Sequence, residues 1–124
     1  ALKEVGVGEV IVYCVNDAAV MGEWAKDQGT ADIDFITFMG DPSSSVTEAL
    51  DMSLVPLGEG QAEYEGMFGP NGKGLYKRSK RFAMYIKDGD IALTKVAESL
   101  TDPAGDDHPD VTLAEALVAD IKAM

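Results

Sequence analysis

The sequence predicts an α/β fold, because patterns typical of strands and of helices alternate along the chain. Val10 to Val15 is a run of mostly β-branched or aromatic residues, and the polar pair Asn16-Asp17 then offers an N-cap to an apolar segment with helical spacing. Asp34 to Met39 repeats the strand pattern, and residues 81 to 96 have the pattern of a strand, a turn and a second strand. The expected order is strand, helix, strand, helix, long loop, strand, strand, helix.

The N-terminal third contains the first strand and the first complete helix. Residues 1 to 5 are typical of the last turn of a helix, which Gly6 and Gly8 end. After Asp17 an apolar face continues at helical spacing until Gly29, and its members are Val20, Met21, Trp24 and Ala25. We expect Trp24 to lie in the core.

Two further helices are predicted from capping boxes, in which a Ser or Thr precedes a Glu by three residues. Ser45 and Glu48 predict a short helix from Val46 to Met52. Thr112 and Glu115 predict a final helix, whose apolar face consists of Leu113, Leu117, Val118, Ile121 and Met124. Between these helices, Arg81 to Lys87 and Ile91 to Val96 are expected to pair through the turn Asp88-Gly89-Asp90.

The segment from Ser53 to Ser79 has no periodicity and is rich in glycine, so we expect a long loop or insertion at about 53–79. Its stretch GMFGPNGKG invites comparison with a phosphate-binding loop. Five residues separate Gly66 from Gly72, Gly74 stands where that motif needs Ser or Thr, and no clear strand precedes it. A turn-rich insertion is therefore the preferred interpretation.

Composition limits the classes of partner. The formal net charge of -12 disfavours nucleic acid and anionic membrane surfaces. We find no apolar run long enough to cross a bilayer and no signal-peptide pattern, so the expectation is a soluble, single-domain chain with no membrane insertion. The one cysteine fits a reducing compartment, such as the cytosol, a plastid or a mitochondrion.

Several residues have both a structural and a functional interpretation. Asn16 and Asp17 stand where ligands gather in open α/β sheets, but they are also ordinary cap residues. Cys14 is either inert core or a redox thiol. His108 lies among Asp106, Asp107 and Asp110, where the alternatives are a cation site and a solvated loop; we predict no metal and no cofactor.

Half of the positive charges fall within nine residues near the start of the predicted hairpin. The members of this basic cluster are Lys73, Lys77, Arg78, Lys80 and Arg81. The cluster would either attract an anionic ligand or an acidic partner, or balance neighbouring acidic residues.

Three segments resemble a known family in the right order. VIVYCVNDAAVMGEWAK resembles the strand, "SVND" turn and helix of type II, peroxiredoxin-five-like peroxiredoxins, which are thioredoxin-fold thiol peroxidases. DPSSSVTEALDM and KRSKRFAMYIKDG resemble two later motifs of that family. The resemblance covers essentially all of residues 1–124 apart from the insertion. It implies a single peroxiredoxin-like domain, its C-terminal portion, with a thioredoxin-like mixed sheet and flanking helices.

The resemblance implies one catalytic residue in this chain, Arg81. In the family the corresponding arginine holds the reactive cysteine as a thiolate and stabilises the charge that moves onto a peroxide oxygen. A guanidinium is suited to this role, because it is always charged and donates hydrogen bonds in a planar fork. The structural alternative is an arginine paired with an acidic surface.

The sequence also departs from the family. The motif "P-x-x-x-[T/S]-x-x-C", which carries the peroxide-attacking cysteine, does not occur in these residues, and Cys14 occupies the serine position of "SVND". Positions that carry a resolving cysteine in some members are Val12 and Val111 here. In the family, the strand before the reactive cysteine lies between the strands matched by Val10–Val15 and Arg81–Lys87. The N-terminal strands are thus absent, and we expect a chain that is incomplete, that another polypeptide completes, or that has rearranged its sheet.

Two functions follow from these observations. The first is thiol-dependent reduction of hydrogen peroxide or alkyl hydroperoxides in the complete protein, with thioredoxin, glutaredoxin or glutathione as the reductant. The second is a catalytically silent, peroxiredoxin-like subunit of a larger assembly. A homodimer, and a protein or N-terminal segment that completes the sheet, are the expected partners. A redox sensor acting through Cys14 is a third alternative.

Overall fold

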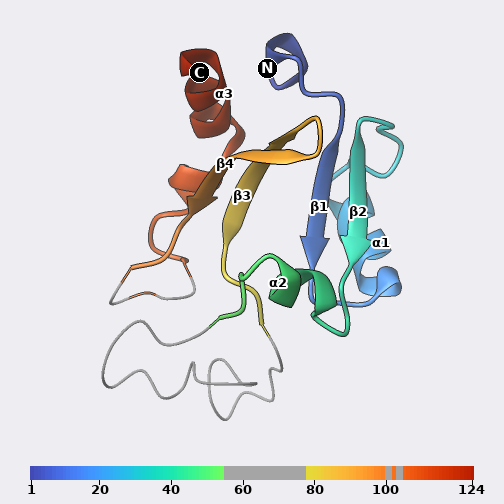
Figure 1. Cartoon of the computed structure of the whole chain (residues 1–124). Helices are drawn as coiled ribbons and strands as arrows, with labels where there is room; N and C mark the ends of the chain where they lie inside the picture. The colour runs from blue at the N-terminus through green and yellow to red at the C-terminus, as the bar shows by residue number, and fades with distance from the viewer. Residues whose placement is uncertain (55–77, 100–101, 103–104) are drawn as a thin grey trace.

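The computed structural model describes residues 1–54, 78–99, 102 and 105–124, and it has the predicted order of elements (Figure 1). The elements are η1 (Lys3–Val5), β1 (Val10–Cys14), α1 (Ala18–Asp27), β2 (Ile36–Gly40), α2 (Ser45–Ala49), β3 (Phe82–Lys87), β4 (Asp90–Val96), η3 (Pro109–Thr112) and α3 (Ala114–Ala123). Most of the insertion predicted at about 53–79 lies outside the described residues. At its two ends Ser53 and Ser79 form an isolated antiparallel bridge.

The first unit of the fold is β1, α1 and β2. The two strands are parallel, and Val10 is paired with Ile36 and Cys14 with Gly40. Helix α1 joins them and buries Met21 and Ala25. The prediction that Trp24 lies in the core is wrong, because its exposed fraction is 40%. Its ring packs edge-on against Phe38, with 5.0 Å between the centroids, and β2 has no strand beyond it among the described residues.

The second unit is the predicted hairpin of β3 and β4, which is confirmed. The strands are antiparallel, with Phe82 paired with Val96 and a shift in register after Tyr85. Asp88 and Gly89 both have positive φ, of 53° and 85°. Two successive left-handed residues are typical of the type I′ turn, whose twist matches that of a hairpin. The turn therefore sits on the two residues best suited to it.

The predicted mixed sheet is present as two separate pairs of strands. Within the described parts of the chain, β1 pairs only with β2, and β3 only with β4. The contact between the pairs is aromatic: Tyr13 of β1 and Phe82 of β3 meet edge to face, with ring centroids 5.7 Å apart. One edge of β1 and one edge of β3 thus have no strand partner among the described residues.

The helix starts differ from the prediction at two of three places. The Asp17 carboxylate accepts a hydrogen bond from the Val20 N–H at 3.0 Å, so its predicted cap role in α1 is confirmed. Neither capping box forms: no side-chain cap bond comes from the N-cap residues Ser44 of α2 and Leu113 of α3. At the start of α2 the N–H groups donate to Asp41 instead, and the Thr112 hydroxyl before α3 is engaged by Arg81. Helix α2 also ends at Ala49, three residues earlier than predicted.

None of the helices in the described ranges is long and apolar enough to cross a membrane.

Candidate functional site

A buried carboxylate organises the end of β2. Asp41 directly follows this strand and is only 4% exposed. Its two oxygens accept hydrogen bonds from the backbone N–H of Val46 (3.2 Å), from the N–H of Thr47 (2.9 Å) and from the Thr47 hydroxyl (2.8 Å). Asp41 thereby satisfies the free N–H groups at the start of α2, which explains why the predicted Ser45–Glu48 box is not needed.

The environment of Asp41 favours its charged form. Burial alone would raise the pKa of this carboxyl, but the hydrogen bonds from Thr47, Val46 and Ser45 together lower the pKa below its ordinary value of 3.8. The carboxylate is therefore ionised at neutral pH. A buried charge is tolerated only where several donors satisfy it, and here the first turn of α2 supplies them.

The hydrogen bonds continue from Asp41 to β1. The Tyr13 hydroxyl lies 3.2 Å from the Thr47 hydroxyl, whose own proton is donated to Asp41. Tyr13 is therefore the donor in the first bond. This chain of three side chains ties β1, α2 and the end of β2 together.

An apolar hollow of about 250 Å³ lies beside this network, on the face of β1 and β2 that carries Tyr13. Its lining residues are Ile11, Tyr13, Met39, Gly40, Asp41 and Val46. Ile11, Met39 and Val46 are each about half exposed. The wall of the hollow is thus apolar and open, with the Tyr13 ring at its side.

The backbone at Gly40 is in close contact with the turn after β1. A Cβ added at Gly40 would lie 2.4 Å from the Asn16 carbonyl oxygen and 3.1 Å from the Asp17 carbonyl carbon. No side chain fits at this distance unless the backbone moves. Asn16 and Asp17 therefore serve here as a turn that packs against the end of β2.

We predict that Gly40→Ala lowers the free energy of unfolding by about 1–3 kcal/mol, because the new methyl group meets backbone rather than a flexible side chain. Gly22→Ala is the matched control: nothing lies within 4 Å of a Cβ there, and α1 should gain up to about 1 kcal/mol. Urea denaturation of both variants checks this prediction. Equal stability of the two variants would contradict the close approach at Gly40.

Arg81 lies immediately before β3, next to the aromatic contact between the two sheets. Its side chain is exposed, and its Nε donates a hydrogen bond to the Thr112 hydroxyl at 2.9 Å. The Thr112 hydroxyl in turn donates to the Pro109 carbonyl at 3.0 Å. Because this hydroxyl is engaged by Arg81 and Pro109, it does not cap α3. Its neighbour Phe82 is the residue whose ring meets Tyr13.

The predicted site residues are not all brought together. Cys14 lies at the carboxyl end of β1 opposite Gly40, and it is half-buried rather than fully buried. It is not a hydrogen-bond partner of Arg81 within the described parts of the chain. Arg81 also forms no ion pair with an acidic side chain in these parts of the chain, since its side-chain partner is a neutral hydroxyl.

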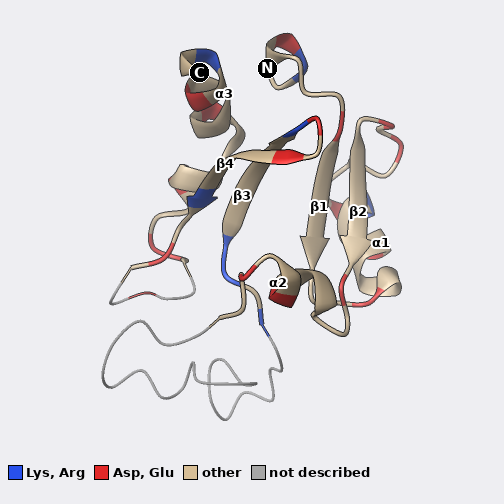
Figure 2. Ribbon diagram, viewed as in Figure 1, with Lys and Arg blue, Asp and Glu red and all other residues tan. Residues whose placement is uncertain are grey.

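The basic cluster is only partly described, because Lys73 and Lys77 lie outside the described residues. Lys80 forms an ion pair with Glu98 at 3.0 Å, and both side chains are mostly buried. Figure 2 shows the positive segment that leads into β3. Charge balance therefore accounts for Lys80, and Arg81 is the member that extends toward η3.

The acidic loop before α3 is also organised by a buried carboxylate. Asp102 is 8% exposed, and it accepts hydrogen bonds from the N–H groups of Gly105 (3.2 Å) and Asp107 (2.8 Å). His108 lies on the surface of this loop. Over residues 1–54, 78–99, 102 and 105–124, no group of three or more His, Cys, Asp or Glu side chains is placed to hold a metal ion.

The sequence interpretation did not single out Asp41, Tyr13 or Thr47 as a network. A signal was available, because an Asp-Pro pair directly after a strand and before a Ser/Thr-rich segment is typical of a helix start capped by aspartate. The partner on β1 had no such signal. Its hydrogen bond depends on the parallel register of β1 and β2.

Comparison with known proteins gives a consistent result. The chain is 31% identical over 87 residues to the hybrid peroxiredoxin hyPrx5 of Haemophilus influenzae, a match that covers 70% of this chain and 29% of that protein. No family model matches the sequence.

Solved structures agree over almost the whole chain. Reduced Prx3 from Vibrio vulnificus, in complex with H2O2, superposes with a TM-score of 0.69 at 27% identity, covering 98% of this chain and 60% of that one. A putative thioredoxin reductase from Burkholderia cenocepacia gives 0.68 at 27% identity, covering 95% and 56%. The chain thus spans under two thirds of the length of these relatives. It is a peroxiredoxin-type protein with a thioredoxin-like fold.

Proposed function

We propose that this chain belongs to a thiol-dependent peroxidase that reduces hydrogen peroxide or alkyl hydroperoxides. The observation that carries the proposal is the position of Arg81, immediately before β3, a strand whose other edge has no strand partner among the described residues. One N–H of its guanidinium is engaged by Thr112, and a guanidinium has five N–H donors. The remaining N–H groups of the guanidinium can donate hydrogen bonds to a thiolate and to a peroxide oxygen.

The reaction needs a nucleophilic thiol, which we assign to a segment beyond these 124 residues. The thiolate attacks one peroxide oxygen, the O–O bond breaks, and the other oxygen leaves as water or an alcohol after taking up a proton. The cysteine becomes a sulfenic acid, and a thiol reductant such as thioredoxin, glutaredoxin or glutathione restores it. Arg81 would favour the thiolate before the attack and stabilise the negative charge on the leaving oxygen during it.

The open edges of β1 and β3 support this assignment of the nucleophile. A strand edge presents a row of backbone N–H and C=O groups, and each such group costs about 1–3 kcal/mol when it is buried without a partner. A strand placed between β1 and β3 would satisfy both rows and unite the two pairs into one mixed sheet. The relatives are longer than this chain and have residues to supply such a strand.

A second function is favoured by the cysteine content. Cys14, the one cysteine of the chain, lies at the end of a strand and is not held by Arg81. If no other thiol lies near Arg81, the protein is a catalytically silent, peroxiredoxin-like subunit. The apolar hollow beside Tyr13 would then be a surface for assembly.

Peroxide consumption by the native protein distinguishes these functions. We expect hydrogen peroxide to disappear in proportion to a supplied thiol reductant, and we expect prior alkylation of thiols to abolish the activity. Cys14→Ser should retain it. A protein without turnover with any of the three reductants would be the silent subunit, and loss of turnover in Cys14→Ser would move the nucleophile to Cys14.

A further inference from the structure

Arg81 is held at two points, one on its backbone and one on its side chain. Its carbonyl accepts a hydrogen bond from the Ala97 N–H at 3.0 Å, which fixes the backbone to the residue that follows β4. Its Nε donates to the hydroxyl of Thr112, the last residue of η3, at 2.9 Å. The position of the guanidinium therefore depends on the segment that precedes α3.

The hydrogen bond to Thr112 decides which donors of Arg81 remain for other groups. The Thr112 hydroxyl donates its own proton to the Pro109 carbonyl at 3.0 Å, so it can only accept from Arg81. With Nε engaged, the donors that remain are on the terminal nitrogens of the guanidinium. These are the groups that the proposed function assigns to the thiolate and the peroxide oxygen.

Helix α3 begins two residues after Thr112 and is loosely attached to the rest of the described structure. None of its residues is buried. Its Asp120 carboxylate forms an ion pair with Lys95 of β4, and these side chains are 39% and 29% exposed. Because Lys95 and Ala97 lie two residues apart, one short stretch of chain holds both α3 and the Arg81 backbone. We call the Lys95–Asp120 ion pair the clamp.

We propose that the docking of α3 regulates the reactivity of the Arg81 site, with Thr112 as the positioning residue and the clamp as the contact that holds the helix. While α3 is docked, Thr112 engages Nε and orients the terminal nitrogens. Release of α3 removes this partner, so a smaller fraction of molecules presents the guanidinium in the productive orientation. A partly exposed ion pair is weak, so a small change in charge shifts the balance. This inference rests on the proposed function.

NMR detects the Arg81–Thr112 contact without any need for activity. The chain contains two arginines, Arg78 and Arg81, so the Nε–H signal of Arg81 is assigned by its loss in Arg81→Lys. In the native protein this proton should exchange slowly with water. Thr112→Val keeps the shape of the side chain but removes the acceptor, and should speed the exchange about tenfold or more. Thr112→Ser restores the hydroxyl and should return the exchange rate to within about threefold of wild type.

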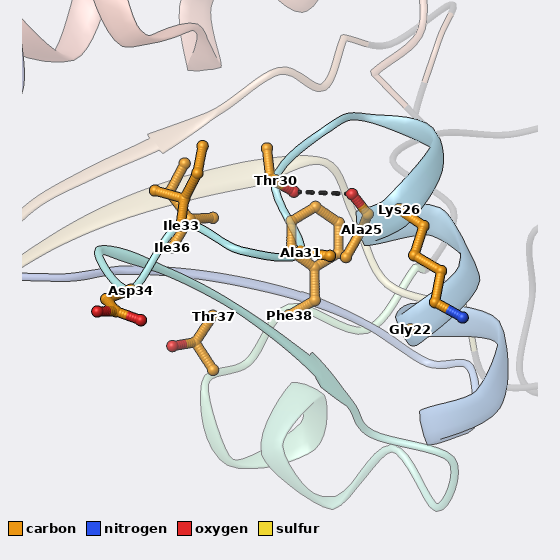
Figure 3. A pocket seen from close by; sticks show the side chains of 10 residues that line it. All are labelled: Gly22, Ala25, Lys26, Thr30, Ala31, Ile33, Asp34, Ile36, Thr37 and Phe38. Atoms are coloured by element: carbon orange, nitrogen blue, oxygen red, sulfur yellow. Dashed lines mark hydrogen bonds between the residues drawn. The ribbon is translucent and has the colours of Figure 1, made fainter.

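The clamp is tested by Asp120→Asn, which removes its negative charge. This variant should speed Nε–H exchange and lower the rate constant for hydrogen peroxide about two- to fivefold. In Asp120→Asn/Thr112→Val the two losses should not add, because both act through one contact. Asp34→Asn is the matched control: Asp34 is an exposed carboxylate beside the hollow of about 480 Å³ between α1 and β2, shown in Figure 3, and its change should alter neither measurement.

The peroxide rate constants of the Thr112 variants complete the test. Thr112→Val should react about tenfold more slowly than the native protein, and Thr112→Ser should react at nearly the native rate. Native rates in both Thr112→Val and Asp120→Asn, with Arg81→Ala slow, would overturn this inference and leave the proposed function intact. Unchanged Nε–H exchange in Asp120→Asn, or fully additive losses in the double variant, would also overturn it. A native protein without turnover would overturn the inference and the proposed function together.

Discussion

Arg81→Ala is expected to lower the rate constant for peroxide reduction by about 100- to 1,000-fold while the fold remains intact. The proposed function assigns to this guanidinium both the stabilisation of the thiolate and that of the developing charge on oxygen. Lys80 is engaged by Glu98. The measurement is the second-order rate constant for hydrogen peroxide, with circular dichroism to confirm that the variant is folded.

Two variants separate catalysis from general charge. Arg81→Lys keeps the charge but loses the planar fork, so it should recover only part of the activity. Lys87→Ala removes an exposed cation at the far end of β3 and should leave the rate unchanged. The assignment of Arg81 would be wrong if Arg81→Ala and Lys87→Ala reacted equally fast. Thr112→Ala should reduce the rate less than Arg81→Ala, because Thr112 only positions the guanidinium.

Asp41→Asn is expected to lower the free energy of unfolding by about 3 kcal/mol. The buried carboxylate accepts three hydrogen bonds from Val46 and Thr47, and an amide offers one acceptor oxygen and turns its NH2 group toward another donor. The Tyr13–Thr47 bond depends on the same hydroxyl. Denaturant unfolding measures the loss. Asp106→Asn, in an exposed loop, should change stability by less than about 0.5 kcal/mol.

The Asp41 effect should depend on pH in a defined direction. The pKa of this carboxyl is lowered on folding, so the unfolded chain takes up its proton at a higher pH than the folded chain does. The stabilisation by the carboxylate is therefore complete above its unfolded pKa of about 3.8 and is lost as the pH falls through the folded pKa. The stability difference between wild type and Asp41→Asn should be constant near neutral pH and should shrink below about pH 4. A difference that grows on acidification would contradict the lowered pKa.

The sequence sufficed to predict most of the fold. Element types follow from local patterns: β-branched runs form β1 and β2, the Asp88-Gly89 pair fixes the hairpin turn, and Asp17 caps α1. The peroxiredoxin resemblance was confirmed by relatives that match the chain over most of its length. These features depend on residues close in sequence or on motifs with a fixed order.

The predictions that were wrong depended on tertiary contacts. The Ser45–Glu48 and Thr112–Glu115 boxes have correct spacing, but Asp41 satisfies the start of α2 and Arg81 engages Thr112. Trp24 has the spacing of a core residue, but its ring packs against Phe38 of β2, which has no strand beyond it among the described residues. No pattern within a single helix reveals how many strands the sheet beyond it contains.

The candidate site was only partly accessible to sequence reasoning. The single catalytic assignment, Arg81, came from a motif, and it stays a prediction. The Tyr13–Thr47–Asp41 chain needs the register of two strands and the start of a helix at once, so no motif encodes it.

The most direct test of the account is the rate at which the native protein consumes hydrogen peroxide in the presence of a thiol reductant, compared with its Cys14→Ser variant. The account predicts thiol-dependent turnover that is the same in both proteins. It places the nucleophilic thiol on a segment between β1 and β3, near Arg81, and not at Cys14. Absence of turnover in the native protein, or its loss in Cys14→Ser, would contradict it.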